Sequence, residues 1–547
     1  MRSYDAIQSR QKAIPGFSDW FLLPLKAGEG VALPGITQLR VLRGSVTING
    51  AKVVPSETVH RVQYPEHIGS TPMMVATTDS STMAVDDSEI NLFDQPDTEF
   101  LSGSVFPDYP VVAAVSPKLH QHPSLNLLKI SNEWEQCANA FIRSLDQPVP
   151  PVASDPCISP QPARIMVTGP KGSGKSTFCR YLANRIITRK PHSSVLFLDA
   201  DPGQPELSLP GTVSLTRISE PIFSLPHVSA ALAFSREEIA SVFFGHASPA
   251  NDPAGFVQAV QTCLECLEEG SNPMIINCHG WMTGIGELTI GAILAAAKPT
   301  FSVSLDKLGA LNDLVPIKGN PLVSDETLFF EINKISIPIG TPTVLDDSST
   351  KSYTLSPADH RWLRFASYFK PSLADATSWL GGRPRDFFEK TGSVVSISRS
   401  HATVSFLDGI NLKTVSDGAD EGYRIEGAKT GVDSVLCSRE WLAEALVGTL
   451  VGFESQKNSL CIGLGLVLAV LPESIEIILP EHVSLKAQEI RILRGSVNWN
   501  PRESQRFGAG GDRPEKFYLA ALGGLDGARN QKSRSGLGRK RLAPEGK

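Results

Sequence analysis

The sequence has no long apolar run. Its two most apolar stretches, Ile290–Ala297 and Ile462–Leu471, fall well short of the ~20 residues that a membrane-spanning helix needs. The N-terminus begins Met1-Arg-Ser-Tyr-Asp-Ala and continues with polar residues rather than with the apolar core of a secretory signal. We therefore expect a soluble, intracellular protein that has no membrane partner.

Cysteine is sparse, and neither sign of charge dominates. The eight cysteines among 547 residues are scattered, so a disulfide framework is excluded and a reducing compartment is favoured. Cys263 and Cys266 form a C-x-x-C on an expected helix, without a second pair at zinc-ligand spacing, and we interpret them as helix core residues. A net charge of −6 excludes a polycation, so any contact with nucleic acid must come from local patches.

The chain is too long for one hydrophobic core, and its texture changes along its length. Short alternating strands, with a hairpin turn signal at Asn49-Gly50, give way to alternating strands and helices, and strands then return. The expected segments are an N-terminal β-rich domain (1–145), a proline-rich linker (146–163), an α/β domain with a mostly parallel sheet and flanking helices (164–385), a C-terminal β-rich domain (386–505) and a basic tail (506–547). We expect the tail to be disordered, and its charge suits RNA contact or nuclear import, with a merely solvating role as the alternative.

One motif in the α/β domain is typical of phosphate binding. Residues 169–177 fit the pattern G-x-x-x-x-G-K-[ST] without a mismatch, between an expected strand at 164–168 and an expected helix. Such a loop wraps phosphates with backbone N–H groups, while its lysine adds a positive charge and its hydroxyl reaches Mg²⁺. A P-loop NTPase domain is therefore predicted, with these nucleotide-binding residues: Gly169, Pro170, Lys171, Gly172, Ser173, Gly174, Lys175, Ser176 and Thr177.

Two carboxylates lie at the end of the next expected strand, Ser194–Asp199. Because side chains alternate along a strand, Asp199 and Asp201 should point to the same face, with Ala200 pointing away. One acid can help to hold Mg²⁺, and the other can accept a proton from an incoming hydroxyl. Two acids favour an acceptor other than water, although one of them could simply cap the following turn.

Further candidates should reach the same edge of the sheet. Gln204 lies in the turn after the second strand, where parallel sheets bind ligands. Trp281 stands in a glycine-rich loop after the third strand, where it can stack on a base, with a core position as the alternative. Arg361 and Arg364 share one face of an expected helix and can bring positive charge to a transferred phosphate, or can form an ordinary surface pair.

Together these motifs resemble the polynucleotide 5′-hydroxyl kinases, and most closely the fungal nucleolar branch that acts in pre-ribosomal RNA processing. The resemblance rests on residues 169–182, on the specific run D-A-D-P-G-Q-P-E at 199–206 and on residues 277–286. It covers about residues 160 to 370, and the flanking β-rich domains match more loosely. The sequence is thereby identified as a candidate member of this family, with the P-loop domain between two β-rich domains.

The resemblance implies transfer of the γ-phosphate of ATP, with Mg²⁺, to the 5′-hydroxyl end of RNA. It implies the following roles: Lys175 and Ser176 for phosphate and metal, Asp199 and Asp201 for metal and base with Asp201 nearer the acceptor, Gln204 and Trp281 for substrate, and Arg361, with Arg364 as the weaker candidate, for a lid over the phosphates. It also implies a partner, the endonuclease that cuts the pre-rRNA spacer and leaves a 5′-hydroxyl end. The resemblance also implies that the protein is located in the nucleus, within the nucleolus.

One position departs from the family pattern. The third loop of the family usually reads Asn-Thr-x-Gly-Trp, and Cys278 here replaces the threonine. If that hydroxyl orients metal or substrate, activity would be reduced. Two other functions stay open, a non-catalytic ATP-binding scaffold subunit of an RNA-processing complex and a regulatory NTPase switch that uses water. The intact Lys175, Ser176 and aspartate pair favour the enzyme, and the sequence does not rank RNA above DNA as the acceptor.

Overall fold

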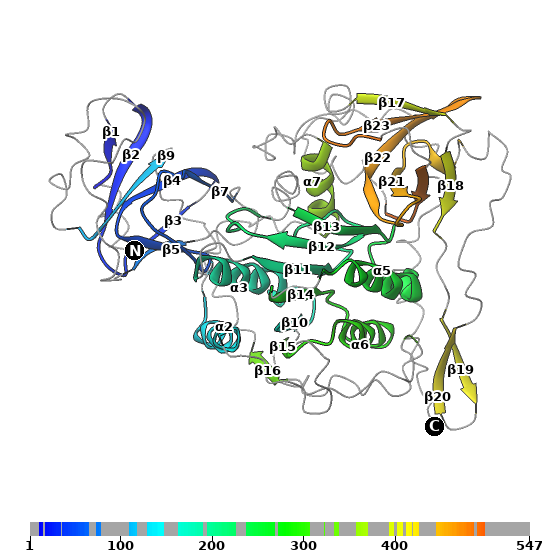
Figure 1. The fold of residues 1–547 in the computed structure, drawn as a ribbon, viewed down its shortest axis with the longest axis horizontal. Coiled ribbons are helices and arrows are strands. Elements are labelled where there is room, and N and C mark those ends of the chain that lie inside the picture. Colours follow the sequence, from blue (N-terminus) through cyan, green and yellow to red (C-terminus); the bar gives the residue numbers. More distant parts are fainter. Residues whose placement is uncertain are drawn as a thin grey trace, which may run out of the picture.

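The structure is a computed structural model. It describes residues 10–14, 17–33, 35–64, 73–77, 109–116, 128, 130–146, 162–189, 194–225, 237–268, 272–306, 322, 333–338, 357–369, 393–398, 402–407, 412–417, 420–425, 443, 445–485 and 490–497. Strands in these residues form five sheets, and the largest lies between N-terminal and C-terminal β-sheets (Figure 1). The expected basic tail (506–547) and most of the proline-rich linker lie outside the described residues.

The N-terminal region is built from two antiparallel sheets. The first has the order β1 (Lys12–Ile14), β2 (Phe17–Leu25), β9 (Val111–Ser116), β4 (Gly35–Arg43), β7 (His60–Tyr64), and the second the order β3 (Gly30–Ala32), β8 (Met73–Thr77), β5 (Ser45–Ile48), β6 (Ala51–Val53). Their buried aliphatic residues, among them Leu23, Val41 and Val46, form one apolar cluster. The expectation of a β-rich region before the P-loop domain is confirmed.

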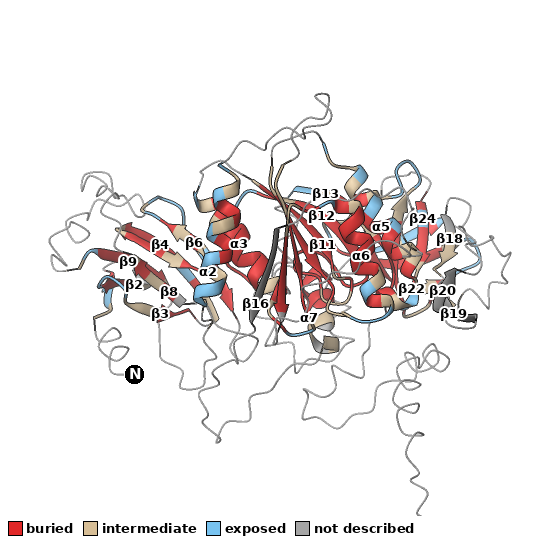
Figure 2. Ribbon diagram, turned by 90° about the horizontal axis from the view of Figure 1, so that it is seen from below, coloured by how far each residue is buried: buried red, intermediate tan, exposed pale blue. Residues whose placement is uncertain are grey.

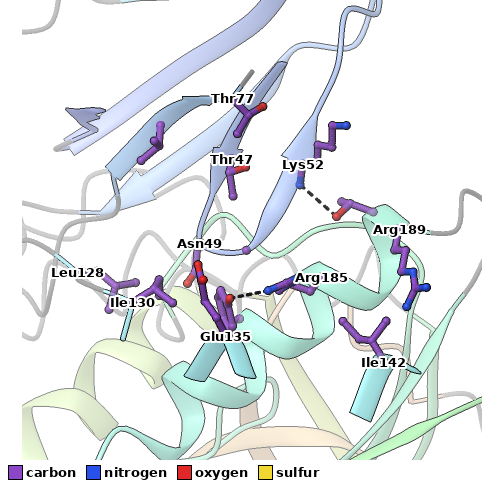
Figure 3. A pocket seen from close by; sticks show the side chains of 14 residues that line it. Thr47, Asn49, Lys52, Thr77, Leu128, Ile130, Glu135, Ile142, Arg185 and Arg189 are labelled. Carbon is purple, nitrogen blue, oxygen red and sulfur yellow. Dashed lines mark hydrogen bonds between the residues drawn. The ribbon is translucent and has the colours of Figure 1, made fainter. Parts of the chain in front are cut away.

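The predicted hairpin turn at Asn49-Gly50 is also confirmed. Both residues have positive φ (45° and 84°), and Ile48 pairs directly with Ala51 across the turn. The turn lies on helix α3 (Lys175–Arg189), where the backbone N–H of Lys52 donates to Thr188. A cavity of about 750 Å³ opens beside this contact, between the hairpin, α3 and helix α2 (Asn132–Ser144) (Figure 3).

Replacing Gly50 with alanine should weaken this contact. A Cβ there would lie 2.6 Å from the carbonyl oxygen of Tyr181, and the φ of +84° disfavours any L side chain. We expect a loss of ~3 kcal/mol in the free energy of unfolding, measured by urea denaturation. Gly28 is the matched control, because it has a φ of +77° but nothing within 4 Å of a Cβ, so Gly28→Ala should cost only ~1 kcal/mol. Equal losses in the two variants would contradict a close contact at Gly50.

The central sheet has seven strands. Their order is β13 (Glu237–Phe243), β12 (Thr212–Ile218), β11 (Val195–Ala200), β14 (Met274–Cys278), β10 (Arg164–Thr168), β15 (Phe301–Asp306), β16 (Asn333–Pro338). The strands from β11 to β16 in this order are parallel, whereas β12 runs antiparallel to both of its neighbours. The prediction of a mostly parallel sheet is confirmed, and the carboxyl ends of β10, β11 and β14 meet at one edge.

Helices cover both faces of this sheet (Figure 2). α2 and α3 lie on one face, and α5 (Pro253–Glu265) and α6 (Ile285–Ala297) lie on the other, beside the short 3-10 helix η4 (Pro249–Asn251). The strand residues alternate accordingly: Ile165 and Val167 pack with α3, and Met166 packs with α5 and α6. This alternation decides which face each polar residue at the strand ends points to.

The C-terminal sheet has six strands. Their order is β17 (Ser393–Ser398), β23 (Ser474–Leu479), β22 (Cys461–Val470), β21 (Leu450–Ser455), β24 (Ile490–Arg494), β18 (Ala402–Phe406), with a separate pair β19 (Leu412–Asp417) and β20 (Asp420–Ile425). The neighbours pair antiparallel except β18 and β24, which are parallel. The fold is therefore a P-loop domain between two β-rich regions, as the sequence predicts.

Two helices pack outside the domain limits that the sequence predicts for them. Residues up to 145 were assigned to the N-terminal domain, but α2 shares the core of the central domain, where Trp134 lies edge-on to Phe178 at 5.1 Å. The sequence division places helix α7 (Pro357–Phe369) in the central domain, and Phe365 and Phe369 lie in a cluster that joins this domain to the C-terminal sheet. The division follows chain order, whereas an amphipathic helix packs wherever its apolar face finds a partner. The other boundaries stay predictions.

None of the helices in the described part of the chain combines the length and the apolarity that crossing a bilayer requires.

Candidate functional site

The loop from Gly169 to Gly174 joins β10 to α3 at the carboxyl edge of the sheet. Its glycines adopt positive φ (141° at Gly169, 77° at Gly172 and 95° at Gly174), a backbone path that other residues rarely follow. The first bond of α3 runs from the N–H of Phe178 to the carbonyl of Gly174. The earlier N–H groups of the helix therefore point toward the loop, as anion binding requires.

Lys175 is buried within this loop. Its Nζ donates to the carbonyl oxygens of Gly169 at 2.9 Å and Pro170 at 3.1 Å. Burial lowers the pKa of Lys175, and the nearby carboxylate of Asp201 opposes that shift. The ammonium group is thus held at the mouth of the loop, with an acid from the neighbouring strand close by.

Ser176 and Asp199 are joined through one amide side chain. Ser176 Oγ donates to Asn277 Oδ1 at 3.3 Å, and Asn277 Nδ2 donates to Asp199 Oδ1 at 3.0 Å. Asp199 Oδ2 accepts from the backbone N–H groups of Glu206 and Leu207. Asp199 is fully buried, and this burial raises its pKa to about 7, while the hydrogen bonds to Leu207 and Asn277 oppose the shift.

The donor set at this point fits Mg²⁺. A hydroxyl, an amide oxygen and a carboxylate lie along one short hydrogen-bonded path, and Mg²⁺ prefers oxygen ligands. In the described ranges no cluster of three or more His, Cys, Asp or Glu side chains forms a metal cage. A Mg²⁺ ion held by Ser176 and Asp199 would therefore complete its shell with phosphate oxygens and water.

Asp201 lies just beyond the end of β11. Its Oδ1 accepts from the N–H groups of Gly203 and Gln204, both at 3.1 Å, and within the described part of the chain Oδ2 accepts no hydrogen bond. Ala200 packs into the cluster on the opposite face, as the alternation predicts. Asp201 therefore caps the turn and still presents one oxygen that can take a proton. Gln204 lies in this turn, with a half-buried side chain.

The third loop is held by His279. The backbone N–H of Trp281 donates to His279 Nδ1 at 3.3 Å, so Nε2 carries the proton toward Thr289 Oγ1 at 2.9 Å. Burial, together with nearby Lys175, lowers the pKa of His279 to about 3, so its ring stays neutral near pH 7. Trp281 itself is half-buried and lies against Gly286, so it is neither a core residue nor fully exposed.

Cys278 does not face Ser176. It is fully buried in the apolar cluster with Ala200 and Phe256, on the face opposite to Asn277, and burial raises the pKa of its thiol to about 12. The side chain in this strand that contacts the P-loop helix is therefore Asn277, one position earlier.

We expect Cys278→Thr to change the turnover number by less than about threefold, because alternation points this side chain away from Ser176. It should lower stability by ~1 kcal/mol, since it buries a hydroxyl. Asn277→Ala is the contrasting variant and should lower activity by ~10–100-fold. A larger effect at Cys278 than at Asn277 in the labelled-ATP assay described below would contradict this placement.

The two arginines of α7 differ in position. Arg364 is buried and donates to the carbonyl of Ser208 at 3.2 Å. Burial lowers the pKa of Arg364, and the carboxylates of Glu206, Asp199 and Asp201 oppose that shift. Arg361, which the sequence ranked higher, is half-buried one turn earlier. The structure thus brings Arg364 to the carboxylates.

Three residues of this site were missed by sequence reasoning: Asn277 as a side-chain partner, Glu206 and Arg180. Asn277 carries a readable signal, since it is a polar residue near the end of an apolar strand that should border the P-loop strand. Arg180 and Glu206 carry no such signal, because they meet only in the folded chain.

The P-loop region of the chain is similar to known proteins. The family profile described as "mRNA cleavage and polyadenylation factor CLP1 P-loop" matches residues 169–321. A protein of Neosartorya fischeri named polynucleotide 5′-hydroxyl-kinase grc3 is 31% identical over 235 residues, which cover 40% of this chain and 26% of that protein. The protein of the same name in Schizosaccharomyces pombe is 34% identical over 154 residues, covering 26% of this chain and 20% of its own. Over its P-loop domain the chain is thus similar to the polynucleotide 5′-hydroxyl kinases.

One similar protein matches over a longer stretch. The grc3 kinase of Emericella nidulans is 27% identical over 390 residues, which cover 64% of this chain and 44% of that protein. The chain thus spans less than half the length of these kinases.

Solved structures share the fold. The wild-type Clp1p–Pcf11p complex matches with a TM-score of 0.50 at 12% identity, covering 89% of this chain and 99% of that one. A second Clp1p structure, described by its extended interface with Pcf11p and by ATP loss in a point mutant, matches with a TM-score of 0.51 at 11% identity, covering 88% of this chain and 99% of that one. These likenesses show that the chain shares its fold with Clp1p.

Proposed function

We propose that the protein is an ATP-dependent polynucleotide 5′-hydroxyl kinase that transfers the γ-phosphate of ATP to the 5′-hydroxyl end of RNA. The observation that carries this proposal is the arrangement at the sheet edge. Lys175 and Ser176 are the first residues of the P-loop helix, and Asp199 is linked to Ser176 by hydrogen bonds through Asn277. Asp201 lies near Lys175, and its Oδ2 accepts no hydrogen bond in the described residues. A second carboxylate beside the phosphate loop supports a hydroxyl acceptor rather than water.

Each residue then has a defined task. The loop N–H groups and Lys175 bind and orient the phosphates, and Ser176 and Asp199 would hold Mg²⁺, which would neutralise charge on the phosphate oxygens. Asp201 Oδ2 takes the proton of the 5′-hydroxyl. Arg364, and Arg361 from the same helix, add positive charge beside the transferred phosphate. Trp281 and Gln204 contact the terminal nucleotide.

The wider setting is proposed on the sequence resemblance. The motifs resemble those of the branch that processes the pre-rRNA internal transcribed spacer, and we propose a nucleolar location and an endonuclease partner that generates the 5′-hydroxyl end. The similar Clp1p structures include a protein partner of Clp1p, Pcf11p. That architecture supports a partner for this chain as well.

The test is a direct transfer assay. The protein is incubated with γ-labelled ATP, Mg²⁺ and a 5′-hydroxyl oligoribonucleotide, with the same oligonucleotide carrying a 5′-phosphate as the control. We expect label on the first substrate alone, and the DNA analogue ranks the two acceptors. ATP binding without transfer, also when the partner nuclease is present, would favour the scaffold function. Phosphate release that needs no acceptor would favour the NTPase switch.

A further inference from the structure

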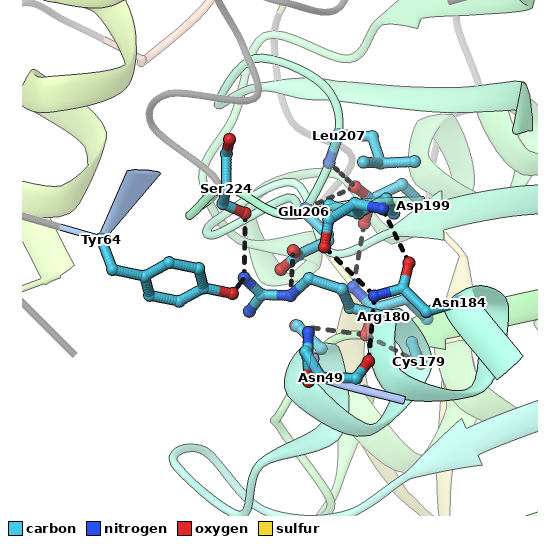
Figure 4. A network of polar contacts seen from close by, with 12 residues as sticks. Asn49, Tyr64, Cys179, Arg180, Asn184, Asp199, Glu206, Leu207 and Ser224 are labelled. Atoms are coloured by element: carbon cyan, nitrogen blue, oxygen red, sulfur yellow. Dashed lines mark hydrogen bonds and ion pairs between the residues drawn. The ribbon is translucent and has the colours of Figure 1, made fainter. Parts of the chain in front are cut away.

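Arg180 and Glu206 form a buried ion pair behind the candidate site. Arg180 lies on α3, one helical turn after Ser176, and its Nε is 3.1 Å from Glu206 Oε1. Their side chains are only 4% and 1% exposed. Figure 4 shows the guanidinium group between Tyr64 on one side and Glu206 on the other. The roles given above leave this pair without a task.

The pair is anchored in the N-terminal sheet. Arg180 Nη1 donates to Tyr64 Oη at 3.1 Å and to the carbonyl of Ser224 at 3.0 Å. Tyr64 is the last residue of β7, the edge strand of that sheet, and residues 223–225 continue the sheet beyond it. Gln63 donates to the carbonyl of Phe223 and accepts from the N–H of Leu225, at 3.0 and 3.2 Å.

The same pair closes a ring with the carboxylate at the metal position. The backbone N–H of Glu206 donates to Asp199, Asp199 accepts from Asn277, and Asn277 accepts from Ser176. Ser176 and Arg180 are four residues apart and so lie on one face of α3. The ring therefore runs from α3 through Glu206, β11 and β14 back to α3.

Stability alone gives a weak reason for such a pair. Removing two charges from water is costly, and well-packed apolar residues of similar size often replace a buried pair without loss. The position of the pair is more informative, because the side chain of Glu206 fixes the backbone N–H that holds Asp199 Oδ2. Partners of this kind commonly tune metal affinity by orienting the ligands.

We propose that Arg180 and Glu206 are positioning residues that hold Asp199 and Ser176 in the geometry for Mg²⁺, and that Tyr64 ties this geometry to the N-terminal sheet. The inference rests on the proposed function only in that Mg²⁺-ATP binds at the P-loop. It does not depend on what receives the phosphate.

The test compares ATP affinity with and without the metal in the full chain. Titration calorimetry gives the Kd for ATP in excess Mg²⁺ and in EDTA, and their ratio is the gain from Mg²⁺. The double variant Arg180→Met, Glu206→Met removes both charges and keeps the side-chain volume. We expect the gain to fall ~10-fold or more, the Kd in EDTA to stay within about threefold, and the thermal midpoint to change little.

Three further variants make the result specific. Arg185→Met is the matched control, because Arg185 lies on the same helix and bonds Asn139 and Tyr181 outside the ring, so it should leave the gain unchanged. Tyr64→Phe removes one hydrogen bond and should lower the gain by a smaller factor. Glu206→Gln keeps the shape of the side chain and should lower the gain if the double variant fails to fold.

A gain within twofold of the wild type in the folded double variant, or in Glu206→Gln, would overturn the inference. A wild-type protein with no gain from Mg²⁺ would overturn it too. Mg²⁺ could raise the ATP affinity of the wild type and do so less in the double variant, while no label reaches RNA. That result would refute the proposed kinase activity and would still support the positioning role.

Discussion

Replacing Lys175 with alanine is expected to lower phosphorylation of a 5′-hydroxyl oligoribonucleotide by about 10²–10³-fold, the usual loss when one preorganised charge on the transition state is removed. Lys175 Nζ rests on the carbonyls of Gly169 and Pro170, directly at the loop that receives the phosphates. The measurement is single-turnover transfer of label from γ-labelled ATP. Thermal unfolding should be close to that of the wild type, because burial already disfavours the charge of this lysine.

Lys171 gives the matched control for this variant. It belongs to the same loop, but its side chain is exposed, so the loop can use its backbone N–H without its charge. Lys171→Ala should therefore change the rate by less than about fivefold, as expected for an exposed side chain. Comparable losses at both lysines would show that the loop responds to its overall charge, and the specific role of Lys175 would be wrong.

Replacing Asp201 with asparagine is expected to lower the turnover number by about 10²–10⁴-fold while leaving the KM for ATP nearly unchanged, as removal of a general base does. Asparagine keeps the Oδ1 acceptor that caps Gly203 and Gln204, so the turn should stay in place. What it loses is the second carboxylate oxygen, the one without a hydrogen bond in the described residues. Initial rates at varied ATP and RNA concentrations separate the two parameters.

Asp201→Ala is the companion variant. It removes the cap as well as the base, so its turnover number should match that of Asp201→Asn. Its free energy of unfolding should be lower by ~1 kcal/mol because the cap is lost, and it should therefore unfold at a lower temperature. An asparagine variant that keeps more than half of the wild-type turnover would leave Asp201 only its turn-capping role. That role was the alternative that the sequence left open.

The parts of the fold that depend on local pattern could be predicted from the sequence. The run at 169–177 lies between a strand and a helix as expected, and Asn49-Gly50 forms the predicted turn. Alternation along β11 placed Asp199 and Ala200 on opposite faces. These features depend on neighbours within a few residues, which the sequence displays directly.

The parts that depend on distant contacts could not be predicted. α2 and α7 are amphipathic, but nothing local says which core receives them. The pairing of Arg180 with Glu206 joins a helix to a turn 26 residues away. Cys278 is different, because it belongs to β14 and alternation from Asn277 turns its side chain away from the metal position, which the strand pattern of the sequence could have shown.

The continuation of the N-terminal sheet by residues 223–225 has a consequence for any shortened form of the protein. A chain cut to begin near residue 160 would keep every motif of the P-loop. The backbone groups of Phe223 and Leu225 would nevertheless lose their hydrogen-bond partner Gln63. It would also leave Arg180 without its phenol partner and Asn184 without the carbonyl of Asn49. The N-terminal β-rich region therefore supplies hydrogen-bond partners to the helix of the nucleotide site, and recombination at the linker would remove them.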